Sequence, residues 1–459
     1  MPGDPRALRG RLKVLGAVSV ALPVAHLLLL LPYALASGRQ AFGGVDWAVN
    51  GALLVVLGLA LGLWWRGHHE GLARLVLVQY ATVGALAVGE LALLWRYPLP
   101  PAQVPLPPIS QVATASNQLP GISGEIRLTV NLQGLRGPNL RPEEADVSVL
   151  CVGGSTTLCL YVSDRDTWPW QLQERLARAT GQRVFVGNAG QNAAFVRHYL
   201  HILQHYPPAA RFQYVVMLAG VNDLALLLSG RYVERLPHVA EEALTPNYIT
   251  NFFRGQATGG RQYRWSEATS GIPWYRSLRL YRLCRVAYLM RTTVTYVPRL
   301  GGDDQEEQRQ RRRRALAQNT RRGLPADTDA FLARYRADLC EVVQLTRTRG
   351  QQLVLLTQPT LFRADLEPDL QRLLIQGSAP NEAVDVATLA AAMDRFNQVV
   401  REVASAEQVP LVDLDRLLPK DTRTFYDDCH FNIEGCGRVA NAIAPVLAEL
   451  VRQAPPRRP

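Results

Sequence analysis

The sequence has few cysteines, and their spacing does not fit a common kind of metal site. Only 6 of the 459 residues are cysteine, namely Cys151, Cys159, Cys284, Cys340, Cys429 and Cys436. No two of them form a CxxC pair, so a structural zinc site is not expected. In an oxidising compartment one or two disulfides could form. The spacing alone does not say which cysteines would pair.

The positive charge of the chain lacks the aromatic residues that would accompany nucleic-acid binding. The formal net charge is +11, and part of it falls in one run, Arg309, Arg311, Arg312, Arg313 and Arg314. No aromatic side chains alternate with these arginines to stack on bases. The residues before the run are acidic: Asp303, Asp304, Glu306 and Glu307. The pattern therefore predicts a helix with i,i+4 ion pairs on a solvated face, and contact with anionic lipid or an acidic glycan is the alternative.

The first hundred residues lack the polar helix faces of a soluble domain. Three apolar stretches, residues 14–36, 47–65 and 75–95, are each roughly long enough to cross a hydrocarbon core as a helix. The first could instead be a signal peptide, since it follows a basic start and ends in small residues. Because two more spans follow it, we favour an uncleaved anchor. Residues 1–97 are thus predicted to form a membrane region with three transmembrane helices.

Basic residues near these stretches predict the orientation in the membrane. The N-terminal cluster ends at Lys13, and the second loop carries Arg66 and Arg74. Such residues tend to stay on the cytoplasmic side. Three crossings from a cytoplasmic start would place everything after residue 95 outside the cytoplasm. We therefore expect a protein of the inner cell membrane with a periplasmic C-terminal part.

After the apolar region the chain changes in character twice. Closely spaced prolines from Pro98 to Pro108 predict a stiff connector, residues 98–120. Residues 121–455 then alternate between buried-strand and helix patterns, which predicts a parallel sheet with helices on both faces. The predicted strands are residues 147–152, 183–186, 213–219, 353–357 and 410–413, after a short strand near residues 126–130. The predicted helices are residues 170–180, 196–205, 331–349, 390–406 and 437–451. Residues 236–329 read as an insertion, with an amphipathic segment near 275–291.

Polar blocks follow three of these strands directly. They are Gly153-Gly154-Ser155, Asn188-Ala189-Gly190 and Gly220-Val221-Asn222-Asp223. Sites on parallel sheets form at the carboxyl ends of strands, so these blocks should meet. Ser155 is the candidate nucleophile, because two glycines tolerate the sharp turn, including positive φ, that would expose its hydroxyl. No lysine follows it, so a phosphate-binding loop is not supported.

A last polar cluster, Asp427-Asp428-Cys429-His430, could supply an acid–base pair. His430 would accept the serine proton, and Asp427, three residues earlier, would orient the imidazole. Asp428 is the competing assignment, and we interpret it as solvent-facing or structural. Acyl transfer also needs donors for a developing oxyanion. The candidates are the backbone N–H groups of Ser155 and Gly190 and the side-chain amide of Asn222.

These blocks resemble the SGNH (GDSL-like) hydrolase family, whose four named residues match Ser155, Gly190, Asn222 and His430. Asp427 occupies the usual Asp-x-x-His position, and Gly154 stands where the family's other name has aspartate. Residues 130–137 and 166–169 also resemble bacterial membrane-linked members. The resemblance implies a flavodoxin-like three-layer fold and hydrolysis or transfer of ester-linked acyl groups.

The sequence therefore predicts a membrane-anchored extracytoplasmic serine esterase or deacylase. An O-acyltransferase acting on an envelope polysaccharide, with a membrane partner that supplies the acyl donor, is one alternative. A non-catalytic envelope-binding module is another. The expected substrate is an acylated carbohydrate or a small ester, with no cofactor, no metal and no nucleic acid. His198, His201 and His205 share one helix face, but no acidic or cysteine partner suggests that they bind a metal.

Overall fold

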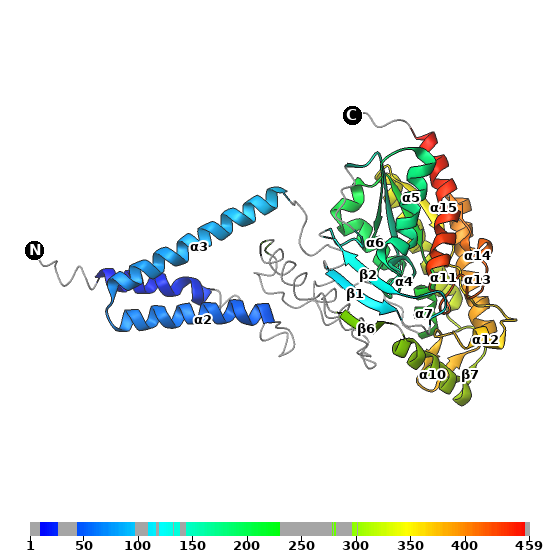
Figure 1. Ribbon diagram of the computed structural model, residues 1–459, viewed down its shortest axis with the longest axis horizontal. Coiled ribbons are helices and arrows are strands. Elements are labelled where there is room, and N and C mark those ends of the chain that lie inside the picture. The colour runs from blue at the N-terminus through cyan, green and yellow to red at the C-terminus, as the bar shows by residue number, and fades with distance from the viewer. Residues whose placement is uncertain are drawn as a thin grey trace, which may run out of the picture. The chain divides into compact units, whose positions relative to one another are not determined.

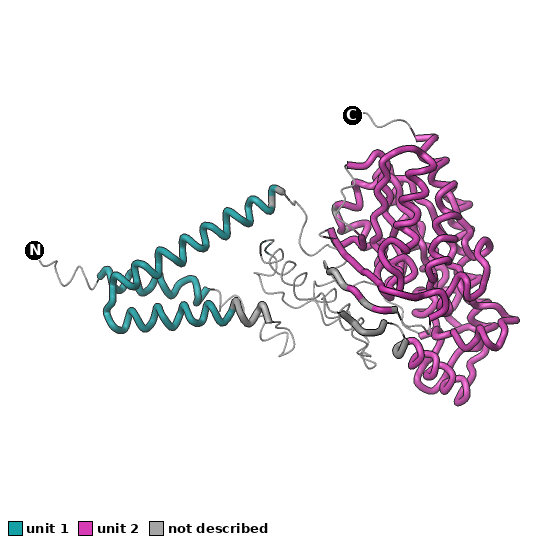
Figure 2. The backbone as a smooth tube through the Cα atoms, in the orientation of Figure 1, with its two compact units in different colours: residues 1–102, 237–242, 264–289 teal, residues 103–236, 243–263, 290–459 magenta. Residues whose placement is uncertain are grey.

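The computed structural model describes residues 10–25, 44–96, 109–115, 119–131, 133–137, 144–229, 278, 280, 296–300 and 302–454. The chain divides into two compact units (Figure 2). The first comprises residues 1–102, 237–242 and 264–289, and the second comprises residues 103–236, 243–263 and 290–459. The predicted insertion therefore contributes to both units.

Long apolar helices make up the described part of the first unit. Residues 10–25 are helical, followed by α2 (Gly44–Trp65) and α3 (His69–Arg96). Among the described residues one helix, His69–Leu93, is long and apolar enough to cross a membrane. Its most apolar stretch has a mean hydropathy of 1.6 and is not buried inside the structure. The apolar part of α2, Asn50–Trp65, is shorter. The second and third predicted spans are thus helical, and the three crossings remain a prediction.

Within the first unit, Glu90 of α3 has a partner from the insertion. Its Oε2 accepts the backbone N–H of Leu280 at 2.9 Å. Residue 280 is one of two described positions in the segment 275–291 that was predicted to be amphipathic, and the rest of that segment lies outside the described residues. A carboxyl in an apolar helix is costly without a partner, and this hydrogen bond offsets part of that cost.

A five-stranded sheet forms the centre of the second unit, and every strand pair in it is parallel. Figure 1 labels the helices of this unit. The strands of the sheet are β3 (Val147–Gly153), β4 (Val184–Asn188), β5 (Tyr214–Leu218), β8 (Gln352–Leu356) and β11 (Leu411–Val412). The spatial order is β11-β8-β5-β3-β4, which in chain order is the flavodoxin-like 2-1-3-4-5 arrangement. The predicted parallel α/β fold is confirmed.

The helices pack in two groups. The chain adds β4 on one side of β3 and the later strands on the other side, so right-handed crossovers place the connecting helices on opposite faces of the sheet. One group is α5 (Trp168–Thr180) with α15 (Ile433–Gln453), and the other is α6 (Val196–His205), α7 (Val221–Ser229), α11 (Thr328–Thr348) and α13 (Val386–Ala406). Every residue of β3 is buried, as expected for a strand covered on both faces. Local signals set the helix ends: Thr167 caps α5, Gly181 ends it at φ 68°, and Asn432 caps α15.

Two small sheets flank this centre. The first contains β1 (Ile109–Ala115), β2 (Glu125–Val130) and β6 (Tyr296–Leu300), and the second contains β7 (Thr320–Arg321), β9 (Ser378–Ala379) and β10 (Glu382–Val384). Strand β1 lies inside the predicted connector 98–120, so that part of the prediction was wrong. The closely spaced prolines end at Pro108, and residues 109–114 pair with β2 in antiparallel register. Short helices are α4 (Ser155–Leu158), α12 (Pro368–Gln371) and α14 (Leu414–Leu417).

The arginine run forms helix α10 (Gly302–Gln318). Its predicted i,i+4 pair occurs between Arg311 and Glu307. The predicted solvated face contains Arg311 and Arg313, whereas Arg309 and Arg312 of the same run are buried. Their guanidinium groups donate to backbone carbonyls of neighbouring segments, which the charge pattern alone could not reveal.

Candidate active site

Ser155 is the first residue of α4 and follows β3 after a single residue. The two glycines before it serve close packing rather than positive φ. A Cβ on Gly153 would lie 2.0 Å from Thr157 Oγ1, and a Cβ on Gly154 would lie 2.5 Å from Asn222 Nδ2. Gly154 itself is extended, with φ −81° and ψ −154°. The space that a side chain at position 154 would need is thus occupied by Asn222.

The structure brings three of the predicted residues into one hydrogen-bonded line. His430 Nε2 lies 2.7 Å from Ser155 Oγ, although the two residues are 275 positions apart. His430 Nδ1 lies 2.7 Å from Asp427 Oδ2. The candidate nucleophile, the candidate base and the candidate orienting carboxylate therefore lie at hydrogen-bond distance, in the order that serine acyl transfer would require.

Asp427 is fully buried, and all of its hydrogen-bond partners are donors. Its Oδ1 accepts the backbone N–H groups of Cys429 at 3.0 Å and His430 at 2.8 Å. Its Oδ2 accepts from His430 and, at 3.3 Å, from Gln305 Nε2. Burial on its own would raise the pKa of Asp427, but the charge of His430 and these hydrogen bonds outweigh it and hold the pKa below its usual value. Asp427 is therefore an anion near neutral pH.

His430 is held by the same interactions from the other side. Burial on its own would lower the pKa of His430, whereas the charge and hydrogen bond of Asp427, with the charge of Asp428, raise it above its usual value. The Tyr426 ring is parallel to the imidazole, with an interplanar angle of 5° and centroids 5.5 Å apart. The ring orientation is thus fixed by Ser155, Asp427 and Tyr426 together.

Asp428 faces away from this line and has a structural environment. Its Oδ2 accepts the backbone N–H groups of Ile375 at 2.9 Å and Gln376 at 2.6 Å. It is fully buried, so the solvent-facing interpretation was wrong and the structural one holds. Burial and the neighbouring charge of Asp427 raise its pKa to about 6.

Two of the predicted oxyanion donors have hydrogens to offer. Asn222, in the first turn of α7, donates one amide hydrogen from Nδ2 to Ala194 O at 2.7 Å, which leaves its second amide hydrogen. Within the described part of the chain the backbone N–H of Ser155 donates no hydrogen bond. Both groups adjoin Gly154, the residue before the candidate nucleophile.

Gly190, the third predicted donor, serves packing instead. Its backbone N–H donates to Asn188 Oδ1 at 2.9 Å. A Cβ at this position would lie 2.3 Å from Leu158 N and 2.7 Å from Thr157 C. The group that approaches Gly190 closely is thus the backbone of α4.

Ala193, a few residues further on, was missed by the sequence reasoning. It has φ 56°, a left-handed conformation that is unfavourable for a residue with a Cβ. Ala193 is exposed, and among the described residues its backbone N–H donates no hydrogen bond. The loop that carries it is fixed at Gln191, whose N–H donates to Gly153 O at 3.0 Å, and at Ala194 O. An alanine in this conformation has no sequence signal, and backbone strain of this kind often marks a functional site.

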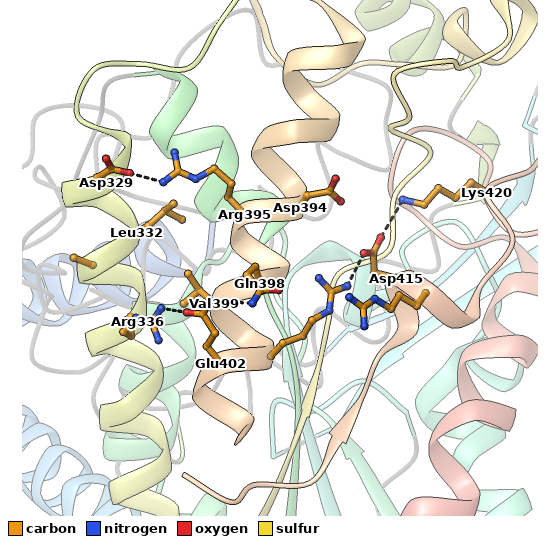
Figure 3. A pocket seen from close by; sticks show the side chains of 13 residues that line it. Asp329, Leu332, Arg336, Asp394, Arg395, Gln398, Val399, Glu402, Asp415 and Lys420 are labelled. Atoms are coloured by element: carbon orange, nitrogen blue, oxygen red, sulfur yellow. Dashed lines mark hydrogen bonds and ion pairs between the residues drawn. The ribbon is translucent and has the colours of Figure 1, made fainter. Parts of the chain in front are cut away.

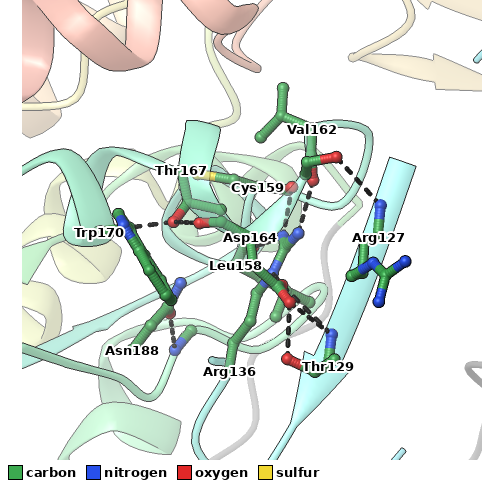
Figure 4. Close-up of polar contacts among 12 residues, drawn as sticks. Arg127, Thr129, Arg136, Leu158, Cys159, Val162, Asp164, Thr167, Trp170 and Asn188 are labelled. Carbon is green, nitrogen blue, oxygen red and sulfur yellow. Dashed lines mark hydrogen bonds and ion pairs between the residues drawn. The ribbon is translucent and has the colours of Figure 1, made fainter. Parts of the chain in front are cut away.

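A buried arginine supports the segment after Ser155 (Figure 4). Arg136 forms a salt bridge with Asp164 at 2.9 Å and donates to the carbonyls of Leu158, Cys159 and Val162. Its backbone N–H donates to Asn188 O at 2.8 Å. Arg136 thereby joins the end of α4 to the end of β4. In the sequence, its segment, residues 130–137, stands out only through the family resemblance.

The cysteines and histidines offer no separate metal site in the described part of the chain. Asp427, Cys429 and His430 are the one group there whose ligand atoms lie within 4.8 Å of one another, and Asp427 and His430 already bond to each other. His198 is buried, and its pKa falls to about 3 because of burial and the nearby His201. Cys159 and Cys436 bring their Sγ atoms to 3.9 Å, and both are free thiols.

A cavity between the helices of the second unit contains none of these residues (Figure 3). It has a volume of about 860 Å³ and is lined by α11, α13 and α14, with none of the predicted site residues in its wall. Its cations are paired, for example Arg336 with Glu402 and Lys420 with Asp415. Charge-balanced walls of this kind do not call for a charged ligand.

No family model and no curated protein match this chain. Solved structures that resemble it include an α/β hydrolase from the metagenome of Lake Arreo, Spain, at 16% identity and a TM-score of 0.35, covering 67% of this chain and 96% of that one. An acetylxylan esterase from Geobacillus stearothermophilus is 13% identical with a TM-score of 0.34, covering 65% and 93%. A lipase/acylhydrolase from Enterococcus faecalis is 14% identical with a TM-score of 0.34, covering 68% and 100%. At these values the similarity assigns no activity, so the function below is derived from the geometry of the chain's own residues.

Proposed function

We propose that this protein is a serine esterase or deacylase of the SGNH type, which removes ester-linked acyl groups. The observation that carries the proposal is the line Ser155 Oγ, His430 and Asp427, with 2.7 Å at each hydrogen bond. The carboxylate at one end is anionic, and at the other end the backbone N–H of Ser155 donates no hydrogen bond among the described residues. A structural histidine would need neither feature.

The chemistry starts from neutral His430 with its proton on Nδ1, facing Asp427. Nε2 takes the hydroxyl proton as Ser155 Oγ attacks the acyl carbon, and the carbonyl oxygen becomes an oxyanion. When the intermediate collapses, Nε2 gives the proton to the leaving alcohol and the acyl group stays on Ser155. A water molecule, deprotonated by His430 in turn, then releases the acid and restores the serine.

Three donors would stabilise the oxyanion in this account. They are the backbone N–H of Ser155, the second amide hydrogen of Asn222 and the backbone N–H of Ala193, which replaces Gly190 in that role. The reason for the replacement is that the Gly190 N–H already has an acceptor in Asn188, whereas the Ala193 N–H has none among the described residues. Preorganised donors of this kind commonly provide the largest catalytic contribution.

The proposal also includes a membrane anchor in residues 1–97 and a catalytic part outside the cytoplasm. Support comes from the exposed apolar surface of α3, where Leu77 is 70% and Val88 67% exposed, and from the basic residues on the predicted cytoplasmic side. An alkaline phosphatase fused after Pro108 should be active, and a fluorescent protein that matures only in the cytoplasm should be dark. The reverse pattern would place the catalytic part in the cytoplasm.

Activity assays on the full chain test the reaction itself. Wild type, Ser155→Ala and the control Ser229→Ala would be incubated with small esters and with acylated glycans, with and without acceptor sugars. Ser229 is exposed and bonds only to Leu226 O, so its loss should be silent. Release of free acid by wild type and the control alone supports the esterase. Acyl transfer that depends on the acceptor would make the protein an O-acyltransferase, and equal turnover by Ser155→Ala would end the proposal.

A further inference from the structure

Helix α10 turns one face toward the loop that carries Asp427 and His430. The buried positions of the helix are Gln305, Arg309, Arg312 and Ala315. Their spacing of three and four residues places them on a single face. The remaining arginines of the run lie on the other side, where Arg311 and Arg313 pair with glutamates of the same helix. The helix therefore has a buried polar face in addition to its solvated one.

This face contacts Asp427 and the residue before it. Gln305 Nε2 donates to Asp427 Oδ2 at 3.3 Å, and Arg309 donates to Tyr426 O at 3.1 Å. Gln305 is 4% exposed and Arg309 is 6% exposed, so neither contact competes with bulk water. Buried hydrogen bonds to a charged group are stronger than neutral ones and are costly to lose.

Arg312 fixes the helix to the segment that holds Asp428. It donates to Gln376 O and, at 2.7 Å, to Val384 O. The backbone N–H of Gln376 in turn donates to Asp428 Oδ2 at 2.6 Å. The helix is thus anchored at one point and reaches Asp427 from another, so its position relative to the acid–base loop is fixed.

We propose that α10 is a brace for the acid–base loop and that Gln305 is a positioning residue that moderates how strongly Asp427 holds the proton of His430. The inference rests on the proposed function, since it concerns the same acid–base pair. The sequence places α10 at the end of the insertion rather than in a strand–helix repeat, so the brace is an addition to the fold.

The physical argument concerns one oxygen atom with two donors. Asp427 Oδ2 accepts from His430 Nδ1 and from Gln305 Nε2. A donated hydrogen bond stabilises a carboxylate and lowers its basicity. Without Gln305, Asp427 would become a stronger partner for the imidazolium, and the pKa of His430 would rise. The other titratable groups around His430 are Asp428, Cys429 and Tyr426 on its own loop, Cys159 at the end of α4 and Arg309 on α10. They are unchanged by the substitution.

The test uses the full-length protein in detergent and the rate at which a fluorophosphonate labels Ser155 as a function of pH. Gln305→Leu removes the amide, and Gln305→Met is a second variant of similar length in case the first does not fold. Gln310→Leu is the matched control, because Gln310 lies on the exposed face of α10 and, among the described residues, its side chain bonds only to Glu306. The acid limb of the Gln305 variants should move to higher pH by roughly half a unit, which means about threefold slower labelling below the limb. Gln310→Leu should follow wild type.

Two results would overturn the brace. An acid limb that stays in place, or moves to lower pH, while labelling slows at every pH would show that Gln305 matters for folding only. An identical profile for Gln305→Leu, Gln310→Leu and wild type would show that it does not matter at all. Failure of the proposed function looks different, because wild type itself would then not be labelled at Ser155.

Discussion

The nucleophile side and the base side of the candidate site are built in different ways. Ser155, the loop with Ala193 and Asn222 all follow parallel strands of one sheet, so the fold itself brings them together. Asp427 and His430 lie on a loop between β11 and α15, and side chains from distant segments hold that loop in place. The carboxyl ends of the parallel strands thus position the candidate nucleophile and its neighbouring donors by topology, whereas the position of the acid–base pair depends on a network of hydrogen bonds.

Removing the candidate nucleophile or the candidate base gives the largest expected effect and tests whether the two sides work as one unit. Ser155→Ala and His430→Ala should each reduce kcat roughly 10⁴-fold or more, measured on a chromogenic ester. Because both act in the same steps, the double variant should be little worse than either single variant. Additive losses would mean that the two residues act independently.

Asp427→Asn and Asp428→Asn compare two neighbours on the base side. Asp427→Asn should reduce kcat about 10³- to 10⁴-fold, because an amide does not hold the required tautomer of His430. The anion of Asp427 raises the pKa of His430, and the base must be neutral to act. The acid limb of kcat/KM should therefore move to lower pH in Asp427→Asn, and by much less in Asp428→Asn, because Asp428 contributes only the smaller effect of its charge to the pKa of His430. If Asp428→Asn lost activity and Asp427→Asn kept it, the orienting acid would be Asp428.

Gly190→Ala and Ala193→Gly compare two positions on the nucleophile side. Gly190→Ala should destabilise by about 2–4 kcal/mol, because its Cβ would meet the backbone of Leu158, which does not move freely. Ala193→Gly should stabilise by about 0.5–1 kcal/mol by relieving the left-handed strain, with activity kept because the donor is a backbone N–H. Thermal unfolding and kcat together check both. A Gly190→Ala variant with normal stability would contradict the close packing of position 190 against α4.

The smallest effect is a pH-dependent stability difference at Asp428. Its pKa is raised to about 6 in the folded protein, above the usual carboxyl range, so its contribution to stability is full at acidic pH. That contribution is lost as pH rises through about 6, since the folded state then carries a buried charge. Asp428→Asn has no such loss, so its Tm relative to wild type should increase between pH 4 and pH 8. A difference that is constant with pH would show that Asp428 is not titrating in this range.

The sequence predicts the nucleophile side better than the base side, for a physical reason. The buried strands and their helix caps are local signals, and the blocks after them inherit their place from the sheet, as with Ser155 and Asn222. The environment of Asp428, the inward face of α10 and the contact of Gln305 with Asp427 arise between segments far apart in sequence. No local pattern encodes them. Even on the nucleophile side, the sequence does not distinguish the roles of Gly190 and Ala193. Which of these two residues takes positive φ depends on how their loop packs against α4.

The most direct test of the central claim is the site of covalent labelling. A fluorophosphonate would be reacted with the full-length protein, and the modified residue would be located by peptide mass mapping. The account predicts one adduct, on Ser155, which disappears in His430→Ala because the hydroxyl then has no base. An adduct on another serine, or undiminished labelling of Ser155 without His430, would contradict it.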